Sequence, residues 1–269
     1  MTSLFSAIIP VFNEEKTVGK VIKTLLNSRL VSEVICINDG SWDRSLDVLK
    51  EFGKRIILIN FKKNQGKGAA VAAGIKRAKG KYLLFCDSDL INFTPEHVQA
   101  MIEPILNNEA KVVLAVPTSN PKGKYNRNQV YLAGERVYPR KALLPHLKKL
   151  ERTKGAGGSE VFLNTLFSKK ETKIIPLIGL IKPRKDDKWP TILAAKQYLF
   201  SAVGVLQEIG RIEINSPSDL KKLENLIQVD TFDDLLTKIR EIKNKKLRVV
   251  LLKYFSKYFS KYFKRLKLK

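Results

Sequence analysis

Two aspartates separated by one residue follow an apolar stretch in the segment LLFCDSDL. On an extended strand, residues two apart project to the same side, so Asp87 and Asp89 can meet one hard cation. Mg²⁺ or Mn²⁺ bound there would keep its other positions for water and for the phosphates of a nucleotide diphosphate. The alternative is an exposed turn rich in Asp and Ser. The apolar strand in front of the pair favours the cation site.

Short apolar runs alternate with amphipathic stretches as far as residue 117, and the aspartate pair ends one of these runs. We expect helices over residues 14–28, from about 43 after Ser41 as N-cap, over 66–80, and over 94–108 with Thr94 as N-cap. Because the strands are apolar throughout, we predict an α/β fold whose central sheet is mostly parallel and carries helices on both faces. Those strands are residues 3–11, 33–39, 55–61, 81–89 and 111–117.

Polar clusters follow the first four of these strands, where a parallel sheet of this kind binds its ligands. They are Asn13-Glu14-Glu15, Asn38-Asp39-Gly40-Ser41, Asn64-Gln65-Gly66-Lys67-Gly68 and Asp87-Ser88-Asp89. Beyond residue 117 the alternation stops. We expect a polar loop, a helix over 131–150 interrupted at Pro139 and Pro145, a glycine turn leading into a helix over 155–167, a strand over 173–180, and helices to the end.

Two common phosphate-binding motifs are absent. The first strand continues into PVFNEE where a dinucleotide fold needs Gly-x-Gly-x-x-Gly, and a phosphate loop would need glycine at Phe61 and a hydroxyl at Gly68. Taken together, AIIPVFNEE, INDGSWD, NQGKGAA and LLFCDSDL resemble, in order and spacing, the nucleotide-sugar half of family 2 glycosyltransferases of the GT-A fold. The resemblance is clear over residues 3–117 and weaker beyond. It implies an enzyme that moves a hexose from a nucleotide diphosphate donor, UDP-linked by family bias, with inversion.

The resemblance also implies roles for single residues of the donor half. The base and ribose would lie along Pro10, Phe12 and Glu14, the base would bond to Asp39, and the donor phosphates would lie near Lys67. The metal motif would be Asp87 and Asp89, with Asp89 the more direct ligand of Mg²⁺ or Mn²⁺.

The second half is similar to the family in fewer places. LAGERVYPR resembles a Gly-x-Arg segment, which makes Arg136 and Arg140 candidate phosphate contacts, with a solvated helix face as the alternative. GAGGSE resembles a glycine-rich element before a sugar-site carboxylate, so Glu160 is the candidate base that activates the acceptor, or else a carboxylate stabilised by a helix dipole. Many relatives have a histidine metal ligand where this chain has Lys182, which leaves the third ligand open and suggests that Lys182 holds diphosphate directly.

The chain's charge restricts its partners. With 50 Lys and Arg against 26 Asp and Glu, the formal net charge of +24 indicates an anionic partner. Nucleic acid is the alternative that charge alone allows, although no nucleic-acid motif occurs. Cys36 and Cys86 lie in apolar runs and are expected to be core thiols of a reducing compartment. No secretory signal or membrane-spanning run is evident, so we expect a cytoplasmic protein.

The C-terminal segment KYFSKYFSKYFKRLKLK repeats Tyr-Phe-Ser-Lys, and residues 243–269 contain no acid. On a helix, residues four apart lie nearly above one another, so its aromatic residues would form one stripe bordered by lysines. This favours a helix in an anionic membrane interface and a lipid acceptor of the polyprenyl phosphate or diacylglycerol type, on the inner face of the cell membrane. A terminal helix packed on the catalytic domain is the alternative. The membrane residues would be Tyr254, Phe255, Tyr258, Phe259, Tyr262 and Phe263.

The expected domain organisation follows from these assignments. Residues 1–117 form the nucleotide-sugar half and 118–215 the acceptor half of one catalytic domain, 216–244 form a helical extension, and 245–269 form the basic amphipathic helix. The alternatives to a membrane-bound transferase are a glycosyltransferase with a soluble acceptor and a non-catalytic basic protein that binds membranes or nucleic acid.

Overall fold

The structure is a computed structural model that describes residues 4–125, 130, 132–153, 157–183, 232–243, 245, 248–249 and 251–252. The chain divides into two compact units. Unit 1 contains Met1–Thr153 and Ser159–Pro183, and unit 2 contains Lys154–Gly158 and Arg184–Lys269. The boundary expected at residue 117 lies inside unit 1.

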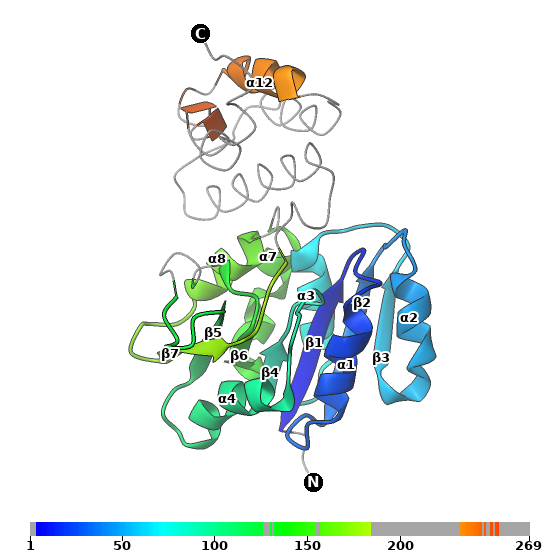
Figure 1. The fold of residues 1–269 in the computed structure, drawn as a ribbon, viewed down its shortest axis with the longest axis vertical. Helices are drawn as coiled ribbons and strands as arrows, with labels where there is room; N and C mark the ends of the chain where they lie inside the picture. Colours follow the sequence, from blue (N-terminus) through cyan, green and yellow to red (C-terminus); the bar gives the residue numbers. More distant parts are fainter. Residues whose placement is uncertain are drawn as a thin grey trace. The chain divides into compact units, whose positions relative to one another are not determined.

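A seven-stranded sheet forms the centre of unit 1, in the order β3-β2-β1-β4-β6-β5-β7 (Figure 1). Its neighbours pair in parallel except where β6 lies between β4 and β5, with which it pairs antiparallel. The predicted mostly parallel sheet is therefore confirmed. Its strands are β1 (Phe5–Val11), β2 (Glu33–Asp39), β3 (Ile57–Phe61), β4 (Tyr82–Phe85), β5 (Val112–Thr118), β6 (Arg136–Pro139) and β7 (Thr172–Ile178).

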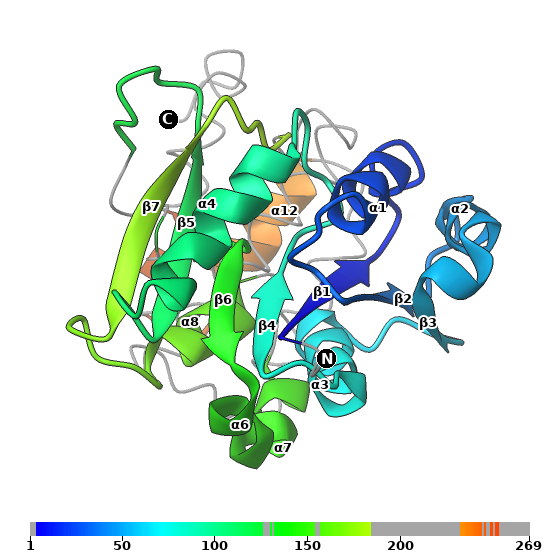
Figure 2. The same ribbon diagram turned by 90° about the horizontal axis from the view of Figure 1, so that it is seen from below.

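Helices cover both faces of this sheet, as Figure 2 shows. One face carries α1 (Val18–Leu26), α2 (Ser45–Glu51) and α4 (Pro95–Leu106). The other face carries α3 (Lys67–Arg77), α6 (Arg140–Leu143), α7 (Leu147–Glu151) and α8 (Gly158–Asn164). The described part of unit 1 also contains two short 3-10 helices, Gly53–Arg55 and Leu144–His146.

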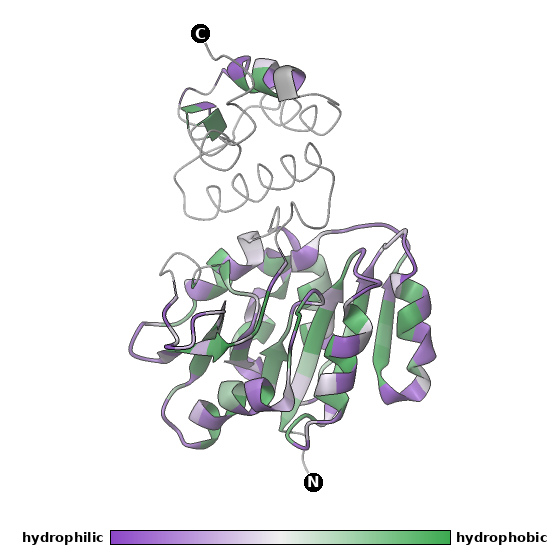
Figure 3. Ribbon diagram, in the orientation of Figure 1, coloured by the Kyte–Doolittle hydropathy of each residue, from purple (hydrophilic) through white to green (hydrophobic). Residues whose placement is uncertain are grey.

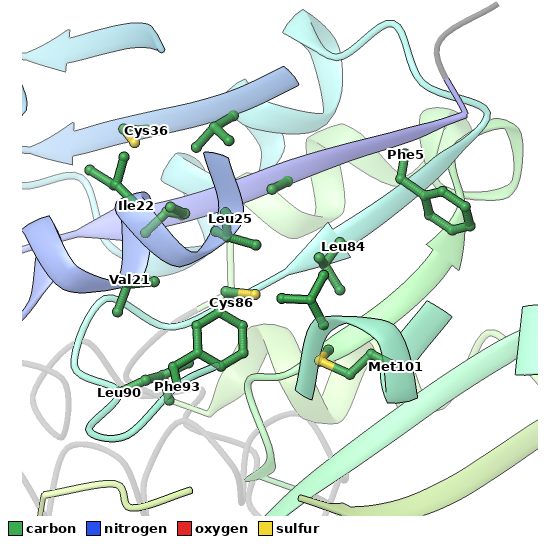
Figure 4. Close-up of a cluster of buried hydrophobic side chains, with 14 of the residues drawn as sticks. Phe5, Val21, Ile22, Leu25, Cys36, Leu84, Cys86, Leu90, Phe93 and Met101 are labelled. Atoms are coloured by element: carbon green, nitrogen blue, oxygen red, sulfur yellow. The ribbon is translucent and has the colours of Figure 1, made fainter. Parts of the chain in front are cut away.

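Each face of the sheet has its own apolar core, because side chains alternate along a strand. In Figure 4, Val21, Ile22 and Leu25 of α1 face the sheet beside Cys36, Leu84 and Cys86. Both cysteines are buried free thiols, which confirms their expected place in the core. Figure 3 shows that the strands are hydrophobic along most of their length while the exposed sides of the helices are hydrophilic.

The helix expected over residues 131–150 is interrupted by a strand that the sequence did not predict. Leu132 is helical, Arg136–Pro139 form the strand β6, and helical segments resume at Arg140. The strand forms because an open ladder position exists between β4 and β5, and Val137 and Tyr138 suit a buried sheet position. Ser41 is also not the cap of α2, since Arg44 holds that position and Ser41 Oγ instead accepts the N–H of Asn13 at 3.0 Å.

Unit 2 is described over one helix, α12 (Phe232–Arg240), and a few residues after it. Leu235 and Ile239, four residues apart, are fully buried, and Asp234 on another side is exposed. Most of the expected extension at 216–244 and the aromatic residues of the tail lie outside the described residues. Among those that are described, no helix has the length and apolar character needed to cross a membrane.

Gly68 sets the distance between α3 and α7. A Cβ atom at this position would overlap Thr153 Oγ1 and the carbonyl oxygen of Leu150, and the second of these is backbone that cannot turn away. We predict that Gly68→Ala lowers the free energy of unfolding by about 1–3 kcal/mol, measured by urea denaturation. Gly19→Ala in α1 is the matched control, because its Cβ would meet only Val48 at 3.4 Å and should not destabilise. Equal stability of the two variants would contradict this packing.

Candidate active site

The carboxylate of Asp87 lies just beyond β4 and is paired with two lysines. Lys67 Nζ donates to Asp87 Oδ1 at 2.6 Å, and Lys182 Nζ donates to Asp87 Oδ2. Only 11% of the Asp87 side chain is exposed. Burial raises its pKa, but the charges of Lys182 and Lys67 outweigh burial and hold the pKa well below its usual range. Asp87 is therefore a permanently charged group.

Lys67 connects Asp87 to a second buried carboxylate, that of Glu160 in the first turn of α8. Lys67 Nζ also donates to Glu160 Oε1, and Ser159 Oγ donates to Glu160 Oε2 at 2.8 Å. Burial raises the pKa of Glu160, but the opposing effect of the Lys67 charge and hydrogen bond contributes to a net downward shift. The first residue of α3, the end of β4 and the start of α8 thus meet through three charged side chains.

The segment Gly134–Arg136 packs against this cluster. A side chain at Gly134 would overlap the Asp87 carboxylate, so glycine is needed for the segment before β6 to pass so closely. Arg136, which pairs with Phe85 across the sheet, is 1% exposed. Its Nη1 donates to the Glu160 carbonyl oxygen at 3.2 Å and to Asn164 Oδ1 at 2.6 Å. Arg136 therefore holds α8 in place and does not lie on a solvated helix face.

A small cavity joins several residues that the sequence singled out. Its volume of about 20 Å³ is enough for one water molecule, so the donor would need a wider opening. Its walls include five sequence-predicted residues: Pro10, Lys67, Asp87, Arg136 and Glu160.

The other predicted donor residues lie at the neighbouring strand ends. Both Asp39 oxygens accept backbone N–H groups, from Gln65 at 2.7 Å and from Gly66 at 3.0 Å, and this fixes the turn that begins α3. Burial raises the pKa of Asp39 despite these bonds. Glu14 Oε2 accepts the hydroxyl of Thr17 at 3.2 Å, and Phe12 is half-buried.

Arg140 is not brought to this cluster. Because β6 runs antiparallel to β4, Arg136 lies near the end of β4 that carries Asp87, and Pro139 lies opposite Tyr82 at the other end. Arg140 Nε donates to the carbonyl oxygen of Ile75, near the end of α3. Its contacts anchor α6 to α3 and give no support to a phosphate contact.

Sequence reasoning missed Glu135. Its side chain is 0% exposed, and neither carboxylate oxygen has a hydrogen-bond partner. Burial raises its pKa to about 7, Lys182 opposes that shift, and the charges of Asp87 and Asp89 add to it. The expected helix concealed this residue, because a glutamate on an amphipathic helix is ordinary. A fully buried glutamate directly before a strand and beside Asp87 is not.

The carboxylates at this edge are the oxygen ligands that Mg²⁺ and Mn²⁺ prefer. The carboxylates of Asp87 and Asp89 fit a hard cation, and the buried Glu135, whose oxygens have no hydrogen-bond partner, adds negative charge that acts on both. Lys182 now takes part of the role of that cation. Within the described residues, no group of three or more His, Cys, Asp or Glu is arranged to hold a metal. The donor set therefore fits a divalent ion once Lys182 leaves Asp87.

Residues 6–170 match the sequence family described as glycosyl transferase family 2. Dolichyl-phosphate beta-glucosyltransferase ALG5D of Trichomonas vaginalis is 35% identical over 96 residues, which are 31% of this chain and 29% of that protein. Undecaprenyl-phosphate 4-deoxy-4-formamido-L-arabinose transferase of Edwardsiella ictaluri is 30% identical over 106 residues, 36% of this chain and 32% of that protein. The match thus spans about a third of the length of these curated relatives.

The fold is similar to that of solved structures as well. Glucosyl-3-phosphoglycerate synthase from Mycobacterium tuberculosis, crystallised with Mn²⁺, UDP-glucose and phosphoglyceric acid, superposes with a TM-score of 0.61 at 21% identity, covering 79% of this chain and 81% of that one. At this identity the likeness concerns the fold, and it agrees with the predicted GT-A architecture.

Lys67 keeps two buried carboxylates charged, so removing its ammonium group should be costly. We predict that Lys67→Met lowers the free energy of unfolding at pH 7 by about 3 kcal/mol. Lys111→Met is the matched control, since the Lys111 side chain is 69% exposed in its pair with Glu171, and it should cost less than about 1 kcal/mol.

The free energy of unfolding should depend on pH through Glu160. The pKa of Glu160 is lowered in the folded protein, so its stabilisation is present above the unfolded pKa and is lost as the pH falls through the folded pKa. Without Lys67 the buried carboxyls take up protons more readily. The difference in the free energy of unfolding between the wild type and Lys67→Met should therefore become smaller between pH 7 and about pH 4, measured by urea denaturation at each pH. A difference that does not change with pH would contradict the ion-pair assignment.

Proposed function

Because this chain belongs to glycosyl transferase family 2, we propose that it moves a hexose from a UDP-linked donor to a phosphate-bearing membrane lipid, with inversion at the anomeric carbon. The observation that carries the proposal is the buried cluster of Lys67, Asp87 and Glu160 at the carboxyl edge of the sheet. Parallel sheets bind nucleotides at this edge, and the cluster supplies charges of both signs there.

The donor diphosphate is an anion that matches the lysine charge at Asp87. Both ammonium groups are paired with Asp87, and Lys67 could pass from Asp87 to an anionic phosphate. Asp87 and Asp89 would hold Mg²⁺ or Mn²⁺, which when bound neutralises charge that builds on the departing diphosphate. Pro10, Phe12, Glu14 and Asp39, on neighbouring strand ends, would receive the nucleoside.

The state of Glu160 bears on the acceptor. A carboxylate with a lowered pKa is a weak base, and Lys67 keeps Glu160 in that state. A hydroxyl acceptor needs a base to remove its proton, whereas an anionic phosphate does not. The cluster thus favours a phosphate acceptor such as a polyprenyl phosphate over a diacylglycerol hydroxyl. Glu160 would then position the sugar hydroxyls.

An apolar cavity of about 490 Å³ supports a lipid as the carrier of that phosphate. Its size is that of a ligand site, and Leu163 lines both this cavity and the small one at Asp87. Its walls are mainly aliphatic and aromatic, among them Leu114, Tyr138, Phe167 and Ile174, with Lys169 as their cation. We propose that the first part of a polyprenyl chain lies here, with its phosphate toward Asp87.

Two further observations support a membrane acceptor. The relatives from T. vaginalis and E. ictaluri are named for dolichyl phosphate and undecaprenyl phosphate. The C-terminal segment combines paired aromatics with lysines and no acid, a composition suited to an anionic lipid surface. We therefore propose that the protein works peripherally on the inner face of the cell membrane. A soluble phosphate acceptor is the second candidate, since the M. tuberculosis enzyme was crystallised with phosphoglyceric acid.

The donor assignment can be tested at Asp89. UDP release from UDP-glucose, in the presence of Mn²⁺ and a polyprenyl phosphate, should fall at least about 100-fold in Asp89→Ala, because the leaving diphosphate loses its charge stabilisation. Asp47→Ala, on the exposed side of α2, is the control and should retain full turnover. Unchanged turnover in Asp89→Ala would overturn the cation site, and turnover of no UDP-hexose by the wild type would overturn the function.

The lipid surface can be tested with the full chain. Replacing the six tail aromatics Tyr254, Phe255, Tyr258, Phe259, Tyr262 and Phe263 by Ser should abolish sedimentation with vesicles containing anionic lipid, because the rings no longer enter the interface. Hexose transfer to a polyprenyl phosphate in vesicles should fall together with vesicle binding, while hexose transfer to a short water-soluble prenyl phosphate should persist. Vesicle binding that is indifferent to the substitutions would contradict the membrane assignment.

A further inference from the structure

Lys182 occupies an unusual position for a lysine. Its ammonium group is paired with Asp87, and it also interacts electrostatically with the carboxylates of Glu135 and Asp89. About a third of its side chain is exposed. A protonated lysine cannot coordinate a metal ion, because its ammonium nitrogen has no free lone pair. A cation that binds Asp87 and Asp89 must therefore compete with Lys182.

Glu135 is the unused partner in this arrangement. A fully buried carboxylate with two partnerless oxygens is costly, and such a group is retained where another state of the protein gives it a partner. Its backbone is fixed, because its carbonyl oxygen accepts the N–H of Ala115 at 2.9 Å and the preceding Gly134 lies against Asp87. Glu135 is therefore held beside the Lys182–Asp87 pair.

We propose that Lys182 is a displaceable internal cation with two carboxylate partners: Asp87 when the site is empty, and Glu135 when a divalent ion holds Asp87. This rests on the proposed function, whose cation site it deepens. Glu135 is a positioning residue, because it acts on the cation site through Lys182. The long flexible stem of a lysine allows such an exchange, and the partial exposure of Lys182 leaves its side chain room to turn.

The exchange keeps Lys182 paired with a carboxylate in both states. In the empty site Lys182 is paired with Asp87, whose negative charge also acts on Glu135. When the divalent ion arrives, Lys182 passes to Glu135, and neither the ammonium nor that carboxylate is left alone. The pairing of Lys182 with Asp87 also lowers the affinity for a divalent ion, because the ion must first displace the lysine.

A double-mutant cycle on Mn²⁺ binding tests the proposal, with free Mn²⁺ measured by electron paramagnetic resonance on the full chain. Lys182→Met should bind Mn²⁺ about tenfold more tightly than the wild type, since the competitor is gone. Glu135→Gln should bind it about tenfold more weakly, since the displaced lysine has no partner. In the Lys182→Met background, Glu135→Gln should change the affinity by less than about twofold. Lys173→Met and Glu109→Gln, from an exposed pair, are the controls.

Each other outcome has a defined meaning. Unchanged or weaker Mn²⁺ binding by Lys182→Met overturns the competition. A loss caused by Glu135→Gln that persists without Lys182 also overturns the exchange, because Glu135 would then be a direct ligand. If thermal melting shows that Glu135→Gln does not fold, the Mn²⁺ affinity of Lys182→Met still tests the competition. UDP-glucose turnover of the wild type separates the two proposals: turnover without the Mn²⁺ pattern removes only the exchange, and the Mn²⁺ pattern without turnover removes only the transferase.

Discussion

The charge of Asp87 is the constraint on which the arrangement of this site depends. A buried carboxylate keeps its charge when cations or hydrogen-bond donors offset the cost of burial, and Lys67 and Lys182 do so for Asp87. Lys67 must begin α3 at the right place, and the backbone N–H groups of Gln65 and Gly66 fix that start by donating to Asp39. On the other side, the segment before β6 approaches so closely that Gly134 can carry no side chain.

The same charge relations explain how the site could act on a nucleotide sugar. Lys67 and Lys182 are paired with carboxylates in the empty state, so an incoming diphosphate and its metal ion exchange partners with groups that are already in position. Preorganised charge of this kind costs little rearrangement during the reaction. Lys67 has a second consequence, because the ionised Glu160 that it maintains is suited to binding sugar hydroxyls and poorly suited to removing a proton.

Sequence reasoning predicted the parallel half of the sheet well, because buried parallel strands are apolar throughout and their polar ends mark the ligand edge. Four of the residues that it singled out, Pro10, Lys67, Asp87 and Glu160, line one small cavity. Sequence reasoning failed at β6, since RVYP has only four residues and its strand character comes from the open position between β4 and β5. That error placed Arg136 on a helix and hid the neighbouring glutamate.

The affinity of the full chain for UDP, measured by isothermal titration calorimetry with Mn²⁺ and again with EDTA, tests the central claim most directly. If the buried carboxylates and lysines form a site for a nucleoside diphosphate and its metal ion, Mn²⁺ should tighten UDP binding by about tenfold or more. Equal affinity in EDTA, or no binding of UDP under either condition, would contradict the account.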